Sequence, residues 1–139
     1  MKRSDDPVLG AHVCPYCRSR PQLVDSDVIY GRSYGAIYLC KPCDAYVGCH
    51  KGTTIPYGRL ADARLRASKR ETHRAFDRLW KEGGMTRTEA YTWLATELNL
   101  SPQEAHVGML DLEQCAKATE AAQNLWIEMK QDRFKNTNL

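Results

Sequence analysis

The spacing of apolar positions changes partway along the chain, and the change separates two kinds of predicted structure. In the first part, apolar residues occur in short runs between glycine and polar residues, a pattern typical of strands and turns. Leu23–Val24 and Val28–Tyr30 are predicted to be extended, residues 31–35 to form a turn, and Ala36–Leu39 to return as a strand. Residues 45–47 are a candidate third strand. This part is therefore predicted to contain a short antiparallel β-hairpin.

After Gly58 the apolar residues recur every three or four positions, which indicates amphipathic helices. The first helix is predicted from Leu60 to Trp80, and the glycines at 83 and 84 end it because glycine readily takes the left-handed cap conformation. Its apolar stripe consists of Ala61, Leu65, Ser68, Thr72, Phe76 and Leu79.

Three capping boxes follow, in which a polar residue is paired with Glu or Gln three positions later. Thr86–Glu89 opens a helix to about Leu98, Ser101–Glu104 opens a short helical turn, and Asp111–Gln114 opens the last helix. Cys115 lies on the apolar face of the last helix and is predicted to pack as a small hydrophobe. Core packing is also predicted for the three tryptophans: Trp80, Trp93 and Trp126.

Four of the six cysteines form two C-x-x-C pairs, which are separated by 22 residues: Cys14, Cys17, Cys40 and Cys43. Two such turns joined by a hairpin supply four sulfur ligands in the tetrahedral arrangement that Zn²⁺ prefers. A redox dithiol is the alternative for one pair, but it requires a strand-to-helix setting and no second pair. The spacing predicts one structural zinc ion that does not catalyse, because four thiolates leave no position open for water.

Cys49 and His50 follow the second pair closely. They could replace a ligand or, with His12, form a second metal site. The simpler interpretation is a packed thiol beside a polar loop histidine, because the four-cysteine set is already complete. The loop from Cys49 to Gly58 is interpreted as a hinge and as a candidate working surface.

These patterns together predict an α+β protein, with an N-terminal zinc ribbon followed by a small bundle of about three main helices. The predicted parts are a zinc ribbon at residues 10–50, a connecting loop at 51–58, a helical domain packed on the ribbon at 59–131, and a frayed tail at 132–139.

Composition limits the class of protein. The 139 residues are 42% hydrophobic and 27% charged, as in ordinary globular proteins. No run approaches the roughly 18 apolar residues that a membrane helix requires, and the charged first seven residues precede no apolar segment. We therefore expect a cytoplasmic protein with no membrane partner. The net charge of +3 does not by itself indicate nucleic-acid binding.

Basic residues are concentrated at the start of the helical part. Residues 59–78 contain seven basic and three acidic side chains. Arg64 and Arg78 are expected to point away from the main basic cluster. The residues expected to contact phosphates are Lys51, Arg59, Arg66, Lys69, Arg70 and Arg74, and those expected to stack on bases are Tyr34, Tyr38, Tyr46 and Tyr57.

His73 and Asp77 are four positions apart on one predicted helix face, where the carboxylate could orient the imidazole. Together with His50 and His106 they are the candidate catalytic residues. No recognised catalytic signature accompanies them, which favours a protein that is not an enzyme, and the enzyme question stays open at this point.

The chain resembles a zinc-finger-containing domain family of unknown function found in small bacterial and phage proteins. The resemblance rests on the first cysteine pair, on the segment YLCKPCDAYVGCHKGTTIPYGRLADARLR from Tyr38 to Arg66, and on scattered positions as far as His106–Gly108. It covers roughly residues 13 to 115. A cysteine often precedes the histidine that corresponds to His106 in similar proteins, whereas this chain has Ala105. The resemblance implies zinc and a bacterial or phage origin, but no activity.

Three functions are compatible with these observations. The leading hypothesis is a zinc-stabilised nucleic-acid-binding module that contacts DNA or RNA phosphates through a basic helix. The first alternative is a protein–protein interaction adaptor that acts on a host complex. The second alternative is a hydrolase or nuclease that uses His50, His73 and Asp77.

Overall fold

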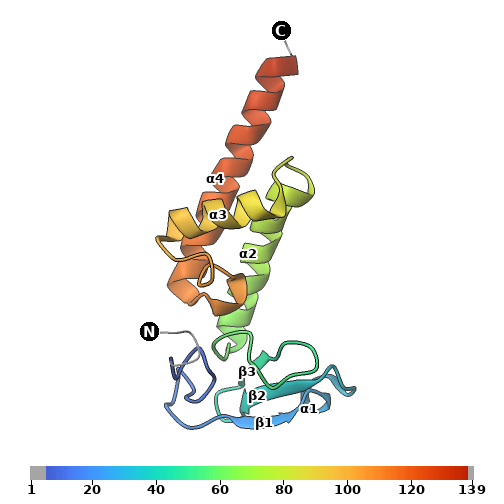
Figure 1. Ribbon diagram of the computed structural model, residues 1–139, viewed down its shortest axis with the longest axis vertical. Helices are drawn as coiled ribbons and strands as arrows, with labels where there is room; N and C mark the ends of the chain where they lie inside the picture. The colour runs from blue at the N-terminus through green and yellow to red at the C-terminus, as the bar shows by residue number, and fades with distance from the viewer. Residues whose placement is uncertain (1–5, 138–139) are drawn as a thin grey trace. The chain divides into compact units, whose positions relative to one another are not determined.

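The computed structural model describes the backbone of residues 6–137 and the side chains of residues 6–132. The chain divides into two compact units, the first ending at Ala67 and the second beginning at Ser68. The first contains strands and the zinc-ligating cysteines, and the second contains long helices (Figure 1). The α+β architecture predicted from the sequence is therefore confirmed. The boundaries at 50 and 58, and the packing of the helices on the ribbon, stay predictions.

Three short strands form the antiparallel sheet of the first unit, in the order β1 (Gln22–Asp25), β2 (Ala36–Cys40) and β3 (Ala45–Gly48). Leu23 pairs with Tyr38, and Tyr38 pairs with Val47. Because directly paired residues share one face of a sheet, Tyr38 and Val47 pack together in the core of this unit. That core consists of Ala11, Cys14, Cys40, Ala45, Val47 and Leu60, with Tyr38 and Cys43 packed against it.

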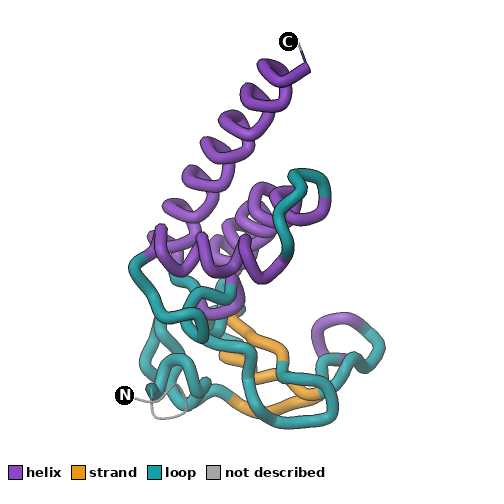
Figure 2. The backbone as a smooth tube through the Cα atoms, turned by 45° about the horizontal axis from the view of Figure 1, so that its top comes forward, coloured by secondary structure: helices purple, strands orange, loops and turns teal. Residues whose placement is uncertain are grey.

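A one-turn helix, α1 (Asp27–Tyr30), lies between β1 and β2 (Figure 2). The prediction that Val28–Tyr30 is extended was therefore wrong. The Asp25 carboxylate accepts a hydrogen bond from the Asp27 N–H at 2.9 Å, and Gly31 closes the turn at a φ of 75°. This local aspartate and glycine chemistry outweighs the β-propensity of the Val-Ile-Tyr run.

The second unit is built from three long helices, α2 (Ala63–Lys81), α3 (Arg87–Leu98) and α4 (Leu112–Thr137), with a short 3₁₀ turn at Val107–Met109. The first residues of α2 belong to the first unit. In α2, Phe76 is fully buried, and its ring meets that of Tyr91 edge-on with centroids 4.9 Å apart. The Thr72 hydroxyl joins α2 to α4 by hydrogen bonding with the Cys115 carbonyl and the Thr119 hydroxyl.

Cys115 is fully buried, as its place on the apolar stripe predicted. The three tryptophans differ from the prediction, because each is only half-buried. Helix α4 also continues to Thr137, so it includes most of the segment 132–139 that was predicted to be a frayed tail. Its last residues contain neither glycine nor proline, so no helix-breaking residue ends it earlier. The rest of that predicted tail, residues 138 and 139, lies outside the described residues.

The capping box of α3 has the predicted pairing. The Thr86 hydroxyl accepts from the Glu89 N–H at 3.0 Å, and the Glu89 carboxylate accepts from the Thr86 N–H at 2.8 Å. Replacing this hydroxyl, in Thr86→Ala, is expected to lower the free energy of unfolding by about 1 kcal/mol, measured by urea denaturation. Thr92→Ala, at an exposed position within α3, is the control. Equal stability of the two variants would show that the cap contributes nothing.

Candidate functional site

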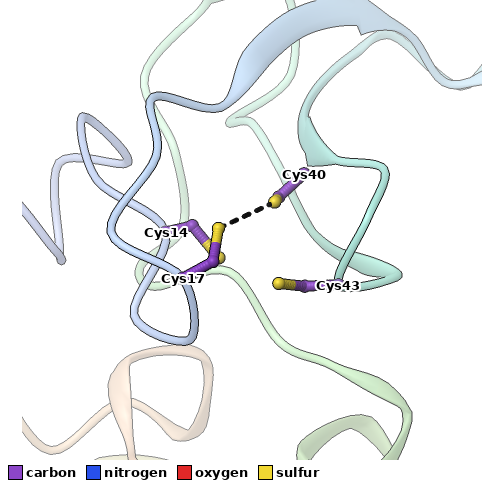
Figure 3. A group of neighbouring side chains, drawn as sticks. All are labelled: Cys14, Cys17, Cys40 and Cys43. Atoms are coloured by element: carbon purple, nitrogen blue, oxygen red, sulfur yellow. Dashed lines mark hydrogen bonds between the residues drawn. The ribbon is translucent and has the colours of Figure 1, made fainter.

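The four paired cysteines come together at one point in the first unit (Figure 3). Cys14 and Cys17 come from the turn before β1, whereas Cys40 ends β2 and Cys43 lies in the turn before β3. Their sulfur atoms all lie within 4.8 Å of one another, and the Cys17 and Cys40 sulfurs are 3.5 Å apart. Zinc–sulfur bonds of about 2.3 Å place tetrahedral ligands about 3.8 Å apart. The four cysteines therefore fit one structural zinc ion.

The two cysteine turns share one backbone feature but are closed by different hydrogen bonds. In each turn the residue after the second cysteine takes a left-handed conformation, with a φ of 68° at Arg18 and 50° at Asp44. In the first turn the Arg18 N–H donates to the Cys14 carbonyl, and in the second the Asp44 N–H donates to the Lys41 carbonyl. These bonds close each turn tightly enough for both sulfurs to face the same point.

The thiols of the cluster differ in acidity. The hydroxyl and the backbone N–H of Ser19 interact with the Cys17 sulfur and lower the Cys17 pKa to about 6. Hydrogen bonding with Cys17, together with burial, raises the pKa of Cys43 to about 12. Zinc ligands must be thiolates, so metal binding releases protons from this site. Cys17 therefore ionises at a lower pH than Cys43.

Cys49, His50 and His12 lie outside the metal-binding cluster found among residues 6–132. Burial raises the pKa of the Cys49 thiol, which disfavours its thiolate form. The His50 ring lies 4.5 Å from the Tyr57 ring, and the backbone N–H of His50 donates to the Ile55 carbonyl at 2.9 Å. Hydrogen bonds within the loop therefore hold His50, in agreement with its interpretation as a polar loop residue.

Two of the predicted phosphate-binding residues have structural roles. The Arg66 Nη1 donates to the carbonyls of Asp44 and Ala61, each at 2.7 Å, and its Nη2 lies 3.1 Å from the Asp44 carboxylate. The same guanidinium lies 4.2 Å from the centre of the Tyr46 ring. Lys69 donates from Nζ to the Gly108 carbonyl at 2.9 Å. Arg66 and Lys69 thus make intramolecular contacts, so they are less suited to binding a phosphate.

Arg70 and Arg74 instead line an open groove in the second unit, together with Arg78 and Lys81. We call this set of four cations the basic groove. Its volume is about 500 Å³, and His73, Asp77 and Glu82 complete the lining. The expectation that Arg78 points away from the cluster was wrong. Residues 70, 74 and 78 are spaced four apart and so lie on one helix face. The sequence spacing alone therefore indicates that Arg78 belongs with Arg70 and Arg74.

The other two predicted phosphate-binding residues belong to the first unit. Lys51 is exposed in the loop that follows His50, and Arg59 is half-buried. Neither lines the basic groove.

The candidate catalytic residues are distributed over both units. The His73 Nδ1 lies 3.5 Å from the Asp77 carboxylate, so the pair predicted from the spacing forms. The His106 ring packs 5.3 Å from the Tyr91 ring and does not line the basic groove. His50 lies in the first unit. A catalytic role for these residues stays a prediction.

A family model described as a zinc-finger-containing domain matches residues 10–125, more than four fifths of the chain. Searches of curated proteins and of solved structures found no match. Across the part of the chain that the structure describes, every helix is too short or too polar to cross a membrane.

Proposed function

The chain belongs to the family of zinc-finger-containing domains, and from this premise we propose that it is a zinc-stabilised module that binds DNA or RNA. The basic groove on α2 contacts the phosphates. The observation that carries the proposal is the alignment of Arg70, Arg74, Arg78 and Lys81 along one groove. We expect the protein to act in the cytoplasm, where reducing conditions keep the four cysteines available for zinc.

The length of the basic groove suits a nucleic-acid backbone. Arg70 and Lys81 are eleven positions apart on one helix, which corresponds to about 16 Å along its axis. One strand of B-form DNA presents about five phosphates over that length. Four cations face two carboxylates along the groove, so the lining has a positive balance. This charge favours a polyanion.

The cations of the groove differ in how firmly they are held. The Arg78 guanidinium lies 4.7 Å from the centre of the Trp126 ring, and Lys130 lies 5.7 Å from the same ring. Packing on the indole holds Arg78 in place and lowers the entropy lost when it binds a phosphate. Arg70 and Arg74 are exposed and form no ion pair with another described residue. They are therefore available to a ligand.

The tyrosines expected to stack on bases are not equivalent. Tyr38 donates its hydroxyl to the Thr54 carbonyl, and Tyr46 is covered on one face by Arg66. Tyr34 and Tyr57 are 69% and 47% exposed, and they remain the candidates for stacking. Stacking on either ring would strengthen the binding of a single-stranded nucleic acid.

The double variant Arg70→Gln/Arg74→Gln tests the proposal. It is expected to weaken binding to fluorescein-labelled duplex or single-stranded probes about tenfold at low salt, because two phosphate contacts are lost. Fluorescence anisotropy measures the affinity. The matched control is Arg64→Gln/Lys117→Gln, which removes two exposed cations outside the basic groove. Equal weakening in both variants, or no binding by the unaltered protein, would contradict the proposal.

A further inference from the structure

A second groove runs between α3 and α4 in the helical unit. Trp93 and Glu97 line it from α3, whereas Glu120, Leu125 and Glu128 line it from α4. We call these residues the acidic groove. Its volume is about 370 Å³, and Ala121 also contributes to its lining. Half-buried apolar side chains thus lie beside carboxylates in one depression between two packed helices.

The carboxylates of the acidic groove outnumber its cations. Within the described residues, neither ion pair of the structure involves Glu97, Glu120 or Glu128. Lys117 is the single cation in the lining, and it also forms no ion pair there. Three negative side chains therefore face one positive side chain. This balance repels phosphate groups and attracts cations.

The spacing of these carboxylates indicates the kind of cation. Glu120 and Glu128 are eight positions apart on α4, which corresponds to about 12 Å along the helix. Among the described residues, the four paired cysteines form the only cluster that could hold a metal ion, and Glu120 and Glu128 are not part of it. A row of separated charges instead suits a ligand with several separated cations. Two turns of a partner helix cover about the same length.

The half-buried indole of Trp93 adds a second mode of recognition. A lysine or arginine side chain gains cation–π attraction at a tryptophan, while its methylene stem packs on apolar side chains. Leu125 and Ala121 supply such apolar contacts in this groove. The groove therefore combines an aromatic surface, apolar packing and carboxylates at helical spacing.

We propose that the acidic groove binds a basic amphipathic helix of a partner protein. Lysine or arginine residues about two turns apart on that helix pair with Glu120 and Glu128, and a further basic residue packs on Trp93 beside Glu97. This is a helix-in-groove interaction. It is independent of the basic groove, so the protein can hold a nucleic acid and a basic protein segment through different helices.

The test uses a fluorescein-labelled peptide of leucine, alanine and lysine, with leucines on one helical face and lysines two turns apart. A matched peptide carries glutamate in place of each lysine. Fluorescence anisotropy with the full chain is expected to show binding of the lysine peptide alone. The double variant Glu120→Gln/Glu128→Gln is expected to bind it at least about fivefold more weakly, because two charge pairs are lost.

The matched control for this variant is Glu71→Gln/Glu113→Gln, which removes two exposed carboxylates from helices outside the acidic groove. It is expected to retain the affinity. Trp93→Leu keeps an apolar side chain without the indole and is expected to weaken binding severalfold. If its melting temperature falls, the double carboxylate variant alone decides the result.

Three results would overturn the proposal: equal affinity for both peptides, equal loss in the control variant, or no binding of the lysine peptide. A fourth is self-association, measured by sedimentation, that Glu120→Gln/Glu128→Gln abolishes. That outcome would make a second copy of this chain the occupant.

Discussion

Cys40→Ser is expected to unfold the N-terminal unit. Cys40 is a buried member of the four-cysteine cluster and also ends β2, so its sulfur joins the metal to the sheet. Zinc binding contributes on the order of 10 kcal/mol in small modules of this kind. Whole domains are stable by only about 5–15 kcal/mol. The sheet, whose apolar core is small, is therefore not expected to persist without the metal.

Zinc content by mass spectrometry and thermal unfolding followed by circular dichroism measure this effect. The unaltered protein is expected to contain one zinc ion per chain, and Cys40→Ser none. Cys49→Ser is the matched control, because Cys49 is a half-buried cysteine outside the cluster. It is expected to keep both the metal and the stability. If Cys40→Ser retained one tightly bound zinc ion, the assignment of the ligands would be wrong.

The helical unit is expected to survive zinc removal, because it has fully buried residues of its own. They include Phe76, Leu94, Leu110 and Cys115. The helical circular dichroism signal should therefore remain when a chelator removes the zinc. The NMR resonances of the residues in the sheet should be lost.

Phe76→Ala is expected to have the second large effect, a loss of about 3–5 kcal/mol in the free energy of unfolding of the helical unit. Phe76 is fully buried and packs edge-on against Tyr91 with ring centroids 4.9 Å apart. Alanine removes the ring and leaves a cavity that the neighbouring helices fill only in part. Urea denaturation followed by circular dichroism measures the loss.

Ile127→Ala is the control for Phe76→Ala. Ile127 lies on α4 and is 52% exposed, so its truncation is expected to change the free energy of unfolding by much less. Zinc content is expected to be normal in both variants, because the ligands belong to the other unit. A similar loss in the two variants would show that Phe76 is not a core residue of the folded protein.

The zinc site could be predicted from the sequence because its four ligands lie in two short sequence motifs. Each C-x-x-C pair lies in one tight turn, and the apolar runs Leu23–Val24 and Ala36–Leu39 between the pairs lie in strands β1 and β2. The capping boxes could be predicted equally well, since the polar residue and its partner are only three positions apart in the sequence. Thr86 and Glu89 form the two predicted hydrogen bonds.

The roles of the arginines were harder to predict because they depend on contacts distant in sequence. Arg66 is held by Asp44 and Tyr46, about twenty positions earlier, and no periodicity within α2 indicates those contacts. Arg78 is a different case, because its place on the face of Arg70 and Arg74 follows from helical spacing alone. The helical turn α1 was also hard to predict. The apolar residues between Asp25 and Gly31 favour a strand, whereas the side chain of Asp25 and the positive φ of Gly31 favour a turn.

The salt dependence of nucleic-acid binding tests the central claim most directly. Four phosphate contacts from the basic groove predict a line of log Kobs against log salt concentration with a slope of about −3.6 for duplex DNA, and about −2.8 for a single strand. Arg74→Gln should make the slope less steep by about 1. A slope near zero, or one unchanged in Arg74→Gln, would contradict phosphate binding by this groove.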